Sequence, residues 1–164
     1  MHTRHGMALA GLALLVASSL AGCATSSSGS RHTLYDSNDA LVADSSDVVV
    51  GTVQSTGTDG DATVATLEVE NTPDNPSLGS NIDADVRTVE VGDVIGVRQQ
   101  TDEKLSAGAQ YLLYLTPTML SGDAADQYYI TGAVAGMYVR DGDVFRRVVP
   151  DSGDTLSETI SISE

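Results

Sequence analysis

Pairs of aspartates in short loops are the residues whose spacing points most directly to chemistry. Asp83 and Asp85 flank an alanine, and Asp141 and Asp143 flank a glycine. Hard cations such as Ca²⁺ take about six to eight oxygen ligands, which loop carboxylates can supply. No stretch matches an EF-hand loop, which ends on a bidentate glutamate, and Asp-Gly is also a turn dipeptide. These four aspartates are therefore weak candidate cation ligands, and we expect no bound metal or cofactor.

A catalytic set is hard to assemble from this composition. Nucleophilic catalysis needs a hydroxyl or thiol beside a basic group. His32 is the one histidine beyond the apolar N-terminal segment, and Lys104, the sole lysine, sits next to Asp102 and Glu103. Two carboxylates can build a glycosidase site, yet the chain has no tryptophan with which to stack sugars. We expect a protein that is not an enzyme.

Tyrosines are the main candidates for molecular recognition, because the chain has six of them and a single phenylalanine. Tyrosine combines a large apolar contact area with a polar tip. Tyr111 and Tyr114 lie in the most apolar run and are expected in the core. Tyr128 and Tyr129 are adjacent, so in a strand they point to opposite faces, and one of them can be exposed. They are the candidate binding residues.

The charge balance limits the classes of partner. Eight lysines and arginines face 23 aspartates and glutamates, which gives a formal net charge of −15. Binding to a nucleic-acid backbone depends on basic side chains that release counterions, so we expect no nucleic-acid partner. Anionic lipid headgroups should also repel the folded part of the chain.

The N-terminus has the layout of a secretory signal. Arg4 precedes an apolar stretch from Met7 to Ala17, and small residues follow up to Cys23, the only cysteine. The stretch is too short for a good membrane-spanning helix. Leu20-Ala21-Gly22-Cys23 resembles the lipobox of bacterial lipoproteins, in which the cysteine thiol is diacylated and the residue becomes the new N-terminus. That resemblance implies a signal peptide over residues 1–22 and lipidation at Cys23.

The anchor is followed by a spacer. Residues 24–30 read ATSSSGS, a composition typical of a flexible coil. We expect an acylated, serine-rich tether over residues 23–38 and one β-rich domain over residues 39–164. Two or three acyl chains satisfy the need for more than one hydrophobic signal in stable anchoring. The expected location is the cell membrane, with the domain on its outer side.

The domain reads as mainly β. Short runs rich in β-branched residues alternate with Gly, Asp, Asn and Pro. One helical turn is expected at 39–44, a loop at 71–82, and either a short helix or an edge strand at 154–162. Asp-Gly pairs at 59–60 and 141–142 predict hairpins. Strands are expected at 47–53, 63–70, 86–91, 94–97, 111–115, 128–131, 136–140 and 145–149.

About seven or eight short strands at this spacing indicate a small closed or partly open antiparallel barrel, or alternatively a β-sandwich. The run from Tyr111 to Leu115 is apolar at every position. A barrel accounts for it better, because one face of that strand fills the lumen and the other packs under a helix or loop.

The order of motifs resembles the netrin/TIMP-like variety of OB-type barrel. Residues 47–53, DVVVGTV, look like its opening strand, and residues 108–115, GAQYLLYL, look like its "G-x-x-Y-L-L-Y-L" strand. The resemblance spans residues 47–149 and implies this architecture and a role in binding. The chain lacks the family's disulfide cysteines. Zinc chelation by a free N-terminal cysteine amine is not carried over, because Cys23 resembles an acylated residue.

Together these features predict a surface-anchored lipoprotein that acts as a non-catalytic binding or assembly module of the cell envelope. Its expected partners are the membrane, through the lipid anchor, and a candidate envelope protein. The alternative is an extracellular module that depends on bound Ca²⁺, or one that resembles a hydrolase and depends on its carboxylates.

Overall fold

The computed structural model describes residues 33–82 and 88–162, so Cys23, Asp83 and Asp85 lie outside the described residues. Eight strands pair into one continuous system within this part of the chain. They are β1 (Asp47–Asp59), β2 (Ala62–Asn71), β3 (Val94–Gln99), β4 (Gln110–Pro117), β5 (Gln127–Ile130), β6 (Met137–Asp141), β7 (Val144–Arg147) and β8 (Thr159–Ile160).

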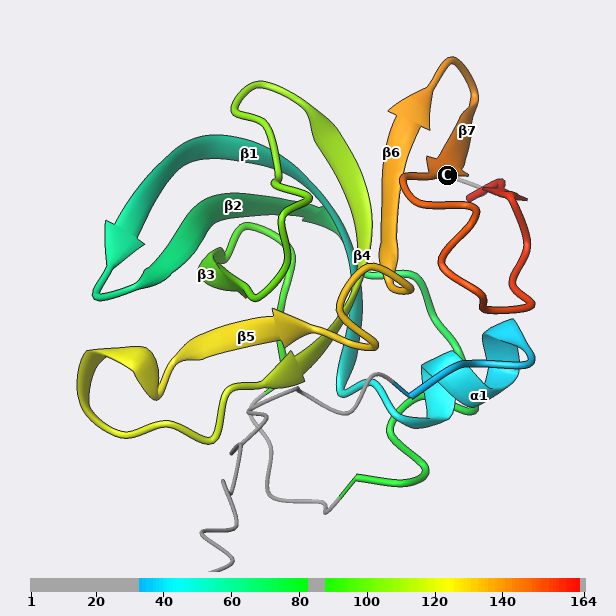
Figure 1. Cartoon of the computed structure of the whole chain (residues 1–164), viewed down its shortest axis with the longest axis horizontal. Coiled ribbons are helices and arrows are strands. Elements are labelled where there is room, and N and C mark those ends of the chain that lie inside the picture. The colour runs from blue at the N-terminus through cyan, green and yellow to red at the C-terminus, as the bar shows by residue number, and fades with distance from the viewer. Residues whose placement is uncertain (1–32, 83–87, 163–164) are drawn as a thin grey trace, which may run out of the picture. The chain divides into compact units, whose positions relative to one another are not determined.

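Five of these strands close into a barrel (Figure 1). Around the barrel the order is β1-β2-β3-β5-β4, and β4 returns to pair with β1. Every pairing is antiparallel except that of β3 with β5, which is parallel. A small closed five-stranded barrel of this kind is compatible with an OB-like domain. The predicted mainly β fold, in its barrel form, is confirmed.

Strand β1 closes the barrel because it pairs with β2 over Val50–Asp59 and with β4 over Asp47–Thr52. Its register against β2 shifts after Val50 and again after Val53, and such bulges bend a strand. Gly51 lies at the first shift. A Cβ there would sit 2.4 Å from the Glu68 carbonyl oxygen, so the bend requires glycine.

The barrel lumen holds the first hydrophobic core. Alternate residues of each barrel strand point inward, as the two-residue period of a strand dictates. The large side chains of this core are fully or almost fully buried: Val49, Val53, Leu67, Val69, Ile95, Val97, Tyr111, Leu113, Leu115, Tyr128, Ile130 and Met137.

A second core lies outside the barrel wall, on the other face of β1 and β4. Leu112 and Tyr114 of β4 belong to it, together with Val48 and Val50 of β1. The short helix α1 (Asn38–Ala43) contributes Leu41 and Val42. The prediction that the run 111–115 serves two apolar layers is therefore confirmed.

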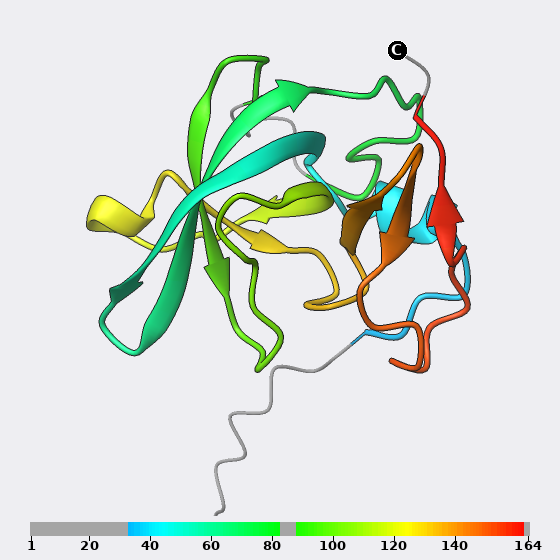
Figure 2. The same ribbon diagram turned by 90° about the horizontal axis from the view of Figure 1, so that it is seen from above.

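Strands β6, β7 and β8 extend the wall and wrap around this second core. β6 pairs with β4 over Tyr111–Leu113, whereas the C-terminal end of β4 pairs with β5. The β6–β7 hairpin turns at Asp141-Gly142, as predicted, and brings Tyr138 and Phe145 into the second core. Figure 2 shows this hairpin and β8 on the side of the domain that carries α1.

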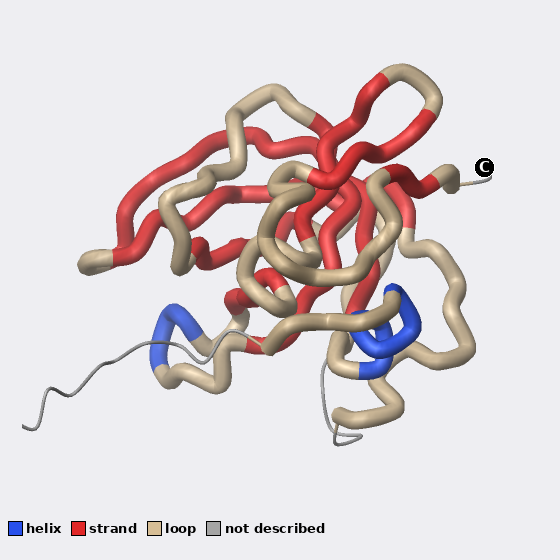
Figure 3. The backbone as a smooth tube through the Cα atoms, turned by 45° about the vertical axis from the view of Figure 1, so that its right-hand side comes forward, coloured by secondary structure: helices blue, strands red, loops and turns tan. Residues whose placement is uncertain are grey.

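Helix is scarce among the described residues. Besides α1, a 3₁₀ turn, η1 (Gly122–Ala124), lies between β4 and β5 (Figure 3). Ser37 caps α1 by accepting a hydrogen bond from the Ala40 amide at 3.2 Å, which satisfies one of the free donors of the first turn. No helix in the described ranges is long and apolar enough to span a membrane.

Two expected boundaries differ from the structure. Tyr35 is 6% exposed and packs in the second core, so ordered packing begins before residue 39. Residues 88–91 form no strand, although a strand was expected over 86–91. The Asp47 carboxylate instead accepts a hydrogen bond from the Val89 amide at 2.8 Å. The segment then turns at Gly92, whose φ is +92°.

Candidate functional site

A cleft opens at the edge of the second core, beside Val50 and Phe145. Its volume is about 260 Å³. Continuing the register of β6 on β4 places Arg140 beside Gln110, and Arg140 pairs directly with Phe145 of β7. Side chains from β1, β2, β4, β6, β7 and the C-terminal segment line the cleft: Val50, Glu70, Asn71, Gln110, Arg140, Phe145 and Ile162.

The second hydrophobic core lies beneath the cleft. Val50 and Phe145 belong to the second core, with exposed fractions of 6% and 0%, and Ile162 packs against that core. The exposed lining of the cleft is mostly polar, in contrast to the mainly hydrophobic lining of typical small-molecule pockets. The volume lies below the roughly 300–1,000 Å³ of pockets for drug-sized molecules, so the cleft suits a small ligand or a single side chain.

Glu70 forms the acidic wall and is held in place from two sides. The Thr52 hydroxyl donates to Oε1 at 2.6 Å, and the Gln110 side-chain amide donates to Oε2. Each carboxylate oxygen can accept more than one hydrogen bond. The carboxylate is therefore oriented by the barrel and retains acceptor capacity for a cationic group.

Arg140 forms the basic wall. Its Nε donates to the Gly142 carbonyl oxygen at 2.6 Å, and its guanidinium carbon lies 5.0 Å from the centre of the Phe145 ring. These two contacts fix the guanidinium plane through a hydrogen bond and a cation–π interaction. Because Nε is occupied, the Nη1 and Nη2 donors are the ones left to face a ligand.

Arg140 differs from the other arginines that the structure describes. Arg98, Arg146 and Arg147 pair with aspartates at 2.6, 2.8 and 3.1 Å. Arg140 forms no ion pair within the described residues, although Glu70 lines the same cleft. Glu70 from β2 and Arg140 from β6 therefore line the same cleft without forming an ion pair with each other.

Neither candidate tyrosine lines this cleft. Tyr128 is 4% exposed and packs in the barrel core, so it offers little surface to a partner. Tyr129 is partly exposed on the outer face of β5, beside Arg98 and Thr116 on the flanking strands. The expected opposite orientation of the two side chains is confirmed, and any surface role falls to Tyr129.

Of the four candidate cation ligands, Asp141 and Asp143 lie in the described part of the chain, whereas Asp83 and Asp85 do not. Asp141 and Asp143 are exposed at the β6–β7 turn, and Arg146 Nε donates to Asp141 Oδ2 at 2.8 Å. Within residues 33–82 and 88–162, no group of three or more His, Cys, Asp or Glu side chains could hold a metal ion.

Asp59, the last residue of β1, is another carboxylate that pairs with an arginine. Arg98 Nη1 donates to its Oδ2 at 2.6 Å. Hydrogen bonds from Arg98 and then Gln127, with the charge of Arg98, hold the pKa of Asp59 below its ordinary range. This carboxylate ties the hairpin tip to β3 and β5.

No protein-family model and no curated protein matches the chain.

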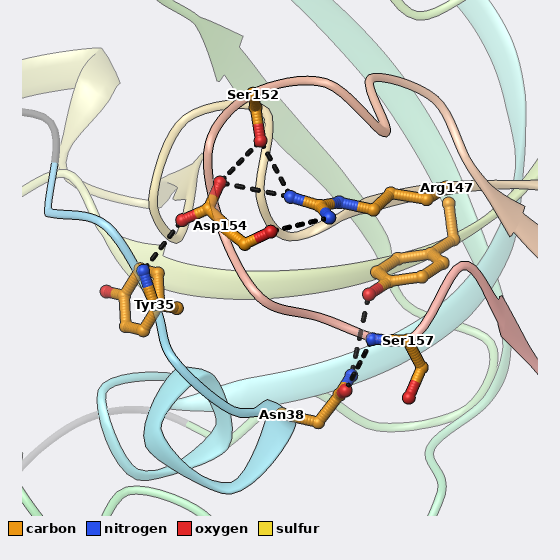
Figure 4. Close-up of polar contacts among 7 residues, drawn as sticks. Tyr35, Asn38, Arg147, Ser152, Asp154 and Ser157 are labelled. Atoms are coloured by element: carbon orange, nitrogen blue, oxygen red, sulfur yellow. Dashed lines mark hydrogen bonds and ion pairs between the residues drawn. The ribbon is translucent and has the colours of Figure 1, made fainter.

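A buried ionic network positions the C-terminal segment that completes the cleft (Figure 4). Arg147 Nη2 lies 3.1 Å from Asp154 Oδ2, and Ser152 bonds to both side chains. Asp154 Oδ1 also accepts the Tyr35 amide at 2.7 Å. These contacts fix the loop after β7, and β8 then leads the chain to Ile162 at the cleft floor.

Sequence analysis did not find Glu70, Gln110 or Arg140. They lie on three strands far apart in the chain, and none of them occupies a defined position of a motif. One available signal was the hairpin at Asp141-Gly142, which places Arg140 opposite Phe145. The contacts between Glu70 and Gln110 depend on how β1 closes the barrel between them, which no local pattern encodes.

Proposed function

We propose that this chain is a lipid-anchored binding module of a bacterial cell envelope, with no catalytic role, held on the outer side of the membrane. The lipobox-like residues 20–23 and the serine-rich stretch 24–30 support the anchor. The cleft supports binding. The observation that carries the proposal is the guanidinium of Arg140, which lies over the Phe145 ring in the cleft and has no ion-pair partner in the described residues.

The structural resemblance is consistent with this role. A closed five-stranded barrel compatible with an OB-like domain offers a rigid wall on which strands can present side chains. The finer netrin/TIMP-like relationship is part of the proposal and implies binding rather than catalysis. Fold by itself does not define function, so the proposed binding role depends on the residues of the cleft.

The anchor is tested by the Cys23→Ser variant in cells. We expect this variant to lose fatty-acid incorporation and to leave the membrane fraction, because the thiol is the acylated group. A Ser27→Ala variant in the same stretch is the matched control and should stay acylated and membrane-bound. Acylation that persists in Cys23→Ser would contradict the anchor.

The binding role is tested by photocrosslinking in intact cells. A photoreactive amino acid at position 71, on the cleft rim, should give a specific adduct, small molecule or envelope protein, that mass spectrometry identifies. The same probe at position 55, an exposed site of β1 outside the cleft, is the control. Identical adducts at both positions, or none at position 71, would contradict binding at the cleft.

The alternative, a module that depends on Ca²⁺ or carboxylates, finds less support. Asp141 is engaged by Arg146, and Asp83 and Asp85 lie outside the described residues. Neutralising Asp141 and Asp143 together, and separately Asp83 and Asp85, is the direct test. A Ca²⁺-induced melting shift that these substitutions abolish would favour the alternative.

A further inference from the structure

We infer that the cleft binds a small zwitterion, a molecule that carries a primary ammonium group and a carboxylate or phosphate group. This inference rests on the proposed binding role and names the ligand class of the same site. Two side chains of opposite charge line this cleft, Glu70 from β2 and Arg140 from β6.

The basic wall is built for an oxyanion. With Nε of Arg140 bonded to the Gly142 carbonyl, the Nη1 and Nη2 groups remain as a two-donor fork. Such a fork matches the two oxygens of a carboxylate or phosphate. The guanidinium carbon lies 5.0 Å from the centre of the Phe145 ring, a contact that restrains the position of this fork.

The acidic wall is built for an ammonium group. Glu70 is oriented by Thr52 and Gln110, which are both neutral donors. The carboxylate therefore keeps its negative charge uncompensated by any ion-pair partner in the described residues. A primary ammonium supplies the donors and the opposite charge that this wall lacks.

The overall charge selects against a simple anion. The chain has a formal net charge of −15, and a field of that sign disfavours the approach of free anions. A zwitterion has no net charge and escapes this repulsion. It can also satisfy both walls at once, whereas a singly charged ligand leaves one wall with only water.

Free amino acids and phosphoethanolamine share this chemistry, so the test must distinguish them. The full-length chain, purified from membranes in neutral detergent, is titrated calorimetrically at neutral pH. The probes are 4-aminobutyrate, glycine and O-phosphoethanolamine. Butyrate and butylammonium, each lacking one charge of 4-aminobutyrate, are the matched controls.

We expect at least one zwitterion to bind about ten-fold or more tightly than either singly charged analogue, in line with a charge-assisted hydrogen bond. Preference for the amino acids or for O-phosphoethanolamine identifies the source. Equal affinity for butyrate and 4-aminobutyrate would overturn the inference, because the cleft would then be a plain anion site.

Substitutions assign the two walls. Arg140→Gln should weaken the binding of 4-aminobutyrate about ten-fold, to the affinity of butylammonium. Glu70→Gln should weaken it about ten-fold, to the affinity of butyrate. Glu68→Gln on the same strand and Arg146→Gln on the same hairpin lie outside the cleft and should leave affinities unchanged. Such ligand-specific losses cannot arise from misfolding.

Two failures are distinguishable. If no probe binds but the crosslinker at position 71 still captures a specific molecule, the zwitterion inference is wrong and the binding role stands. If no probe binds and the crosslinker at position 71 gives no specific adduct, both the zwitterion inference and the proposed binding role are wrong.

Discussion

Arg147 and Asp154 form an ion pair that is closed off from solvent, with Nη2 and Oδ2 3.1 Å apart and side chains 2% and 0% exposed. Asp154 also receives the Tyr35 amide, so one carboxylate joins the segment before α1 to the segment after β7. Removing one partner of such a pair leaves a buried charge uncompensated.

Asp154→Ala should lower the free energy of unfolding by about 3–5 kcal/mol. The matched control is Asp141→Ala, which removes the partner of Arg146 in a pair at 2.8 Å whose side chains are both 55% exposed. That loss should be about 0–1 kcal/mol. Denaturant unfolding measures both, and equal losses would contradict the structural role of the buried pair.

Gly51 and Gly57 lie on the same strand but in different surroundings. Gly51→Ala would bring a Cβ to 2.4 Å from the Glu68 carbonyl oxygen, whereas nothing lies within 4 Å of a Cβ at Gly57. We expect Gly51→Ala to cost about 1–3 kcal/mol or more, as overpacking does, and Gly57→Ala to be nearly neutral. Thermal unfolding of the two variants checks this, and a tolerated Gly51→Ala would refute the tight approach of β1 to β2.

Leu112 and Leu113 are adjacent, and both are 0% exposed, yet they serve different cores. Each substitution to alanine should cost about 2–5 kcal/mol. Hydrogen exchange should separate them: Leu112→Ala loosens β7 and the cleft floor, whereas Leu113→Ala loosens the barrel strand β3. The same exchange pattern in both variants would argue against two separate layers.

Tyrosine ionisation should limit stability at high pH. Burial raises the pKa of Tyr114 to about 12, and burial with the nearby Asp44 carboxylate raises the pKa of Tyr35 to about 12. Because the folded state holds these protons more tightly than the unfolded chain, stability is complete below about pH 10 and falls as the pH rises toward 12.

Ultraviolet absorbance of tyrosinate, followed together with circular dichroism, tests this pH dependence. Tyr35 and Tyr114 should ionise only as the fold is lost, and Tyr35→Phe should make stability less dependent on pH in this range. Ionisation of every tyrosine near pH 10 in a chain that keeps its native spectrum would show that these rings are not buried.

Several features of the fold could be predicted because they depend on neighbours in the sequence. The Asp-Gly turn at 141–142 connects β6 and β7 in a hairpin. The apolar run 111–115 indicates a strand with two buried faces. The segment 88–91 could not be predicted in this way. The Val89 amide donates a hydrogen bond to the Asp47 side chain at 2.8 Å, and these residues are 42 positions apart in the chain.

The sequence by itself determined where strands and turns form and which faces are apolar, because alternation and turn chemistry are local properties of the chain. It also contained the lipobox-like motif, which needs no fold. Only the tertiary structure decided that Glu70 and Arg140 face one cleft while Tyr128 turns into the core. The pleat fixes the direction of each side chain, but barrel closure and strand register fix its neighbours, and these arise from packing over the whole domain.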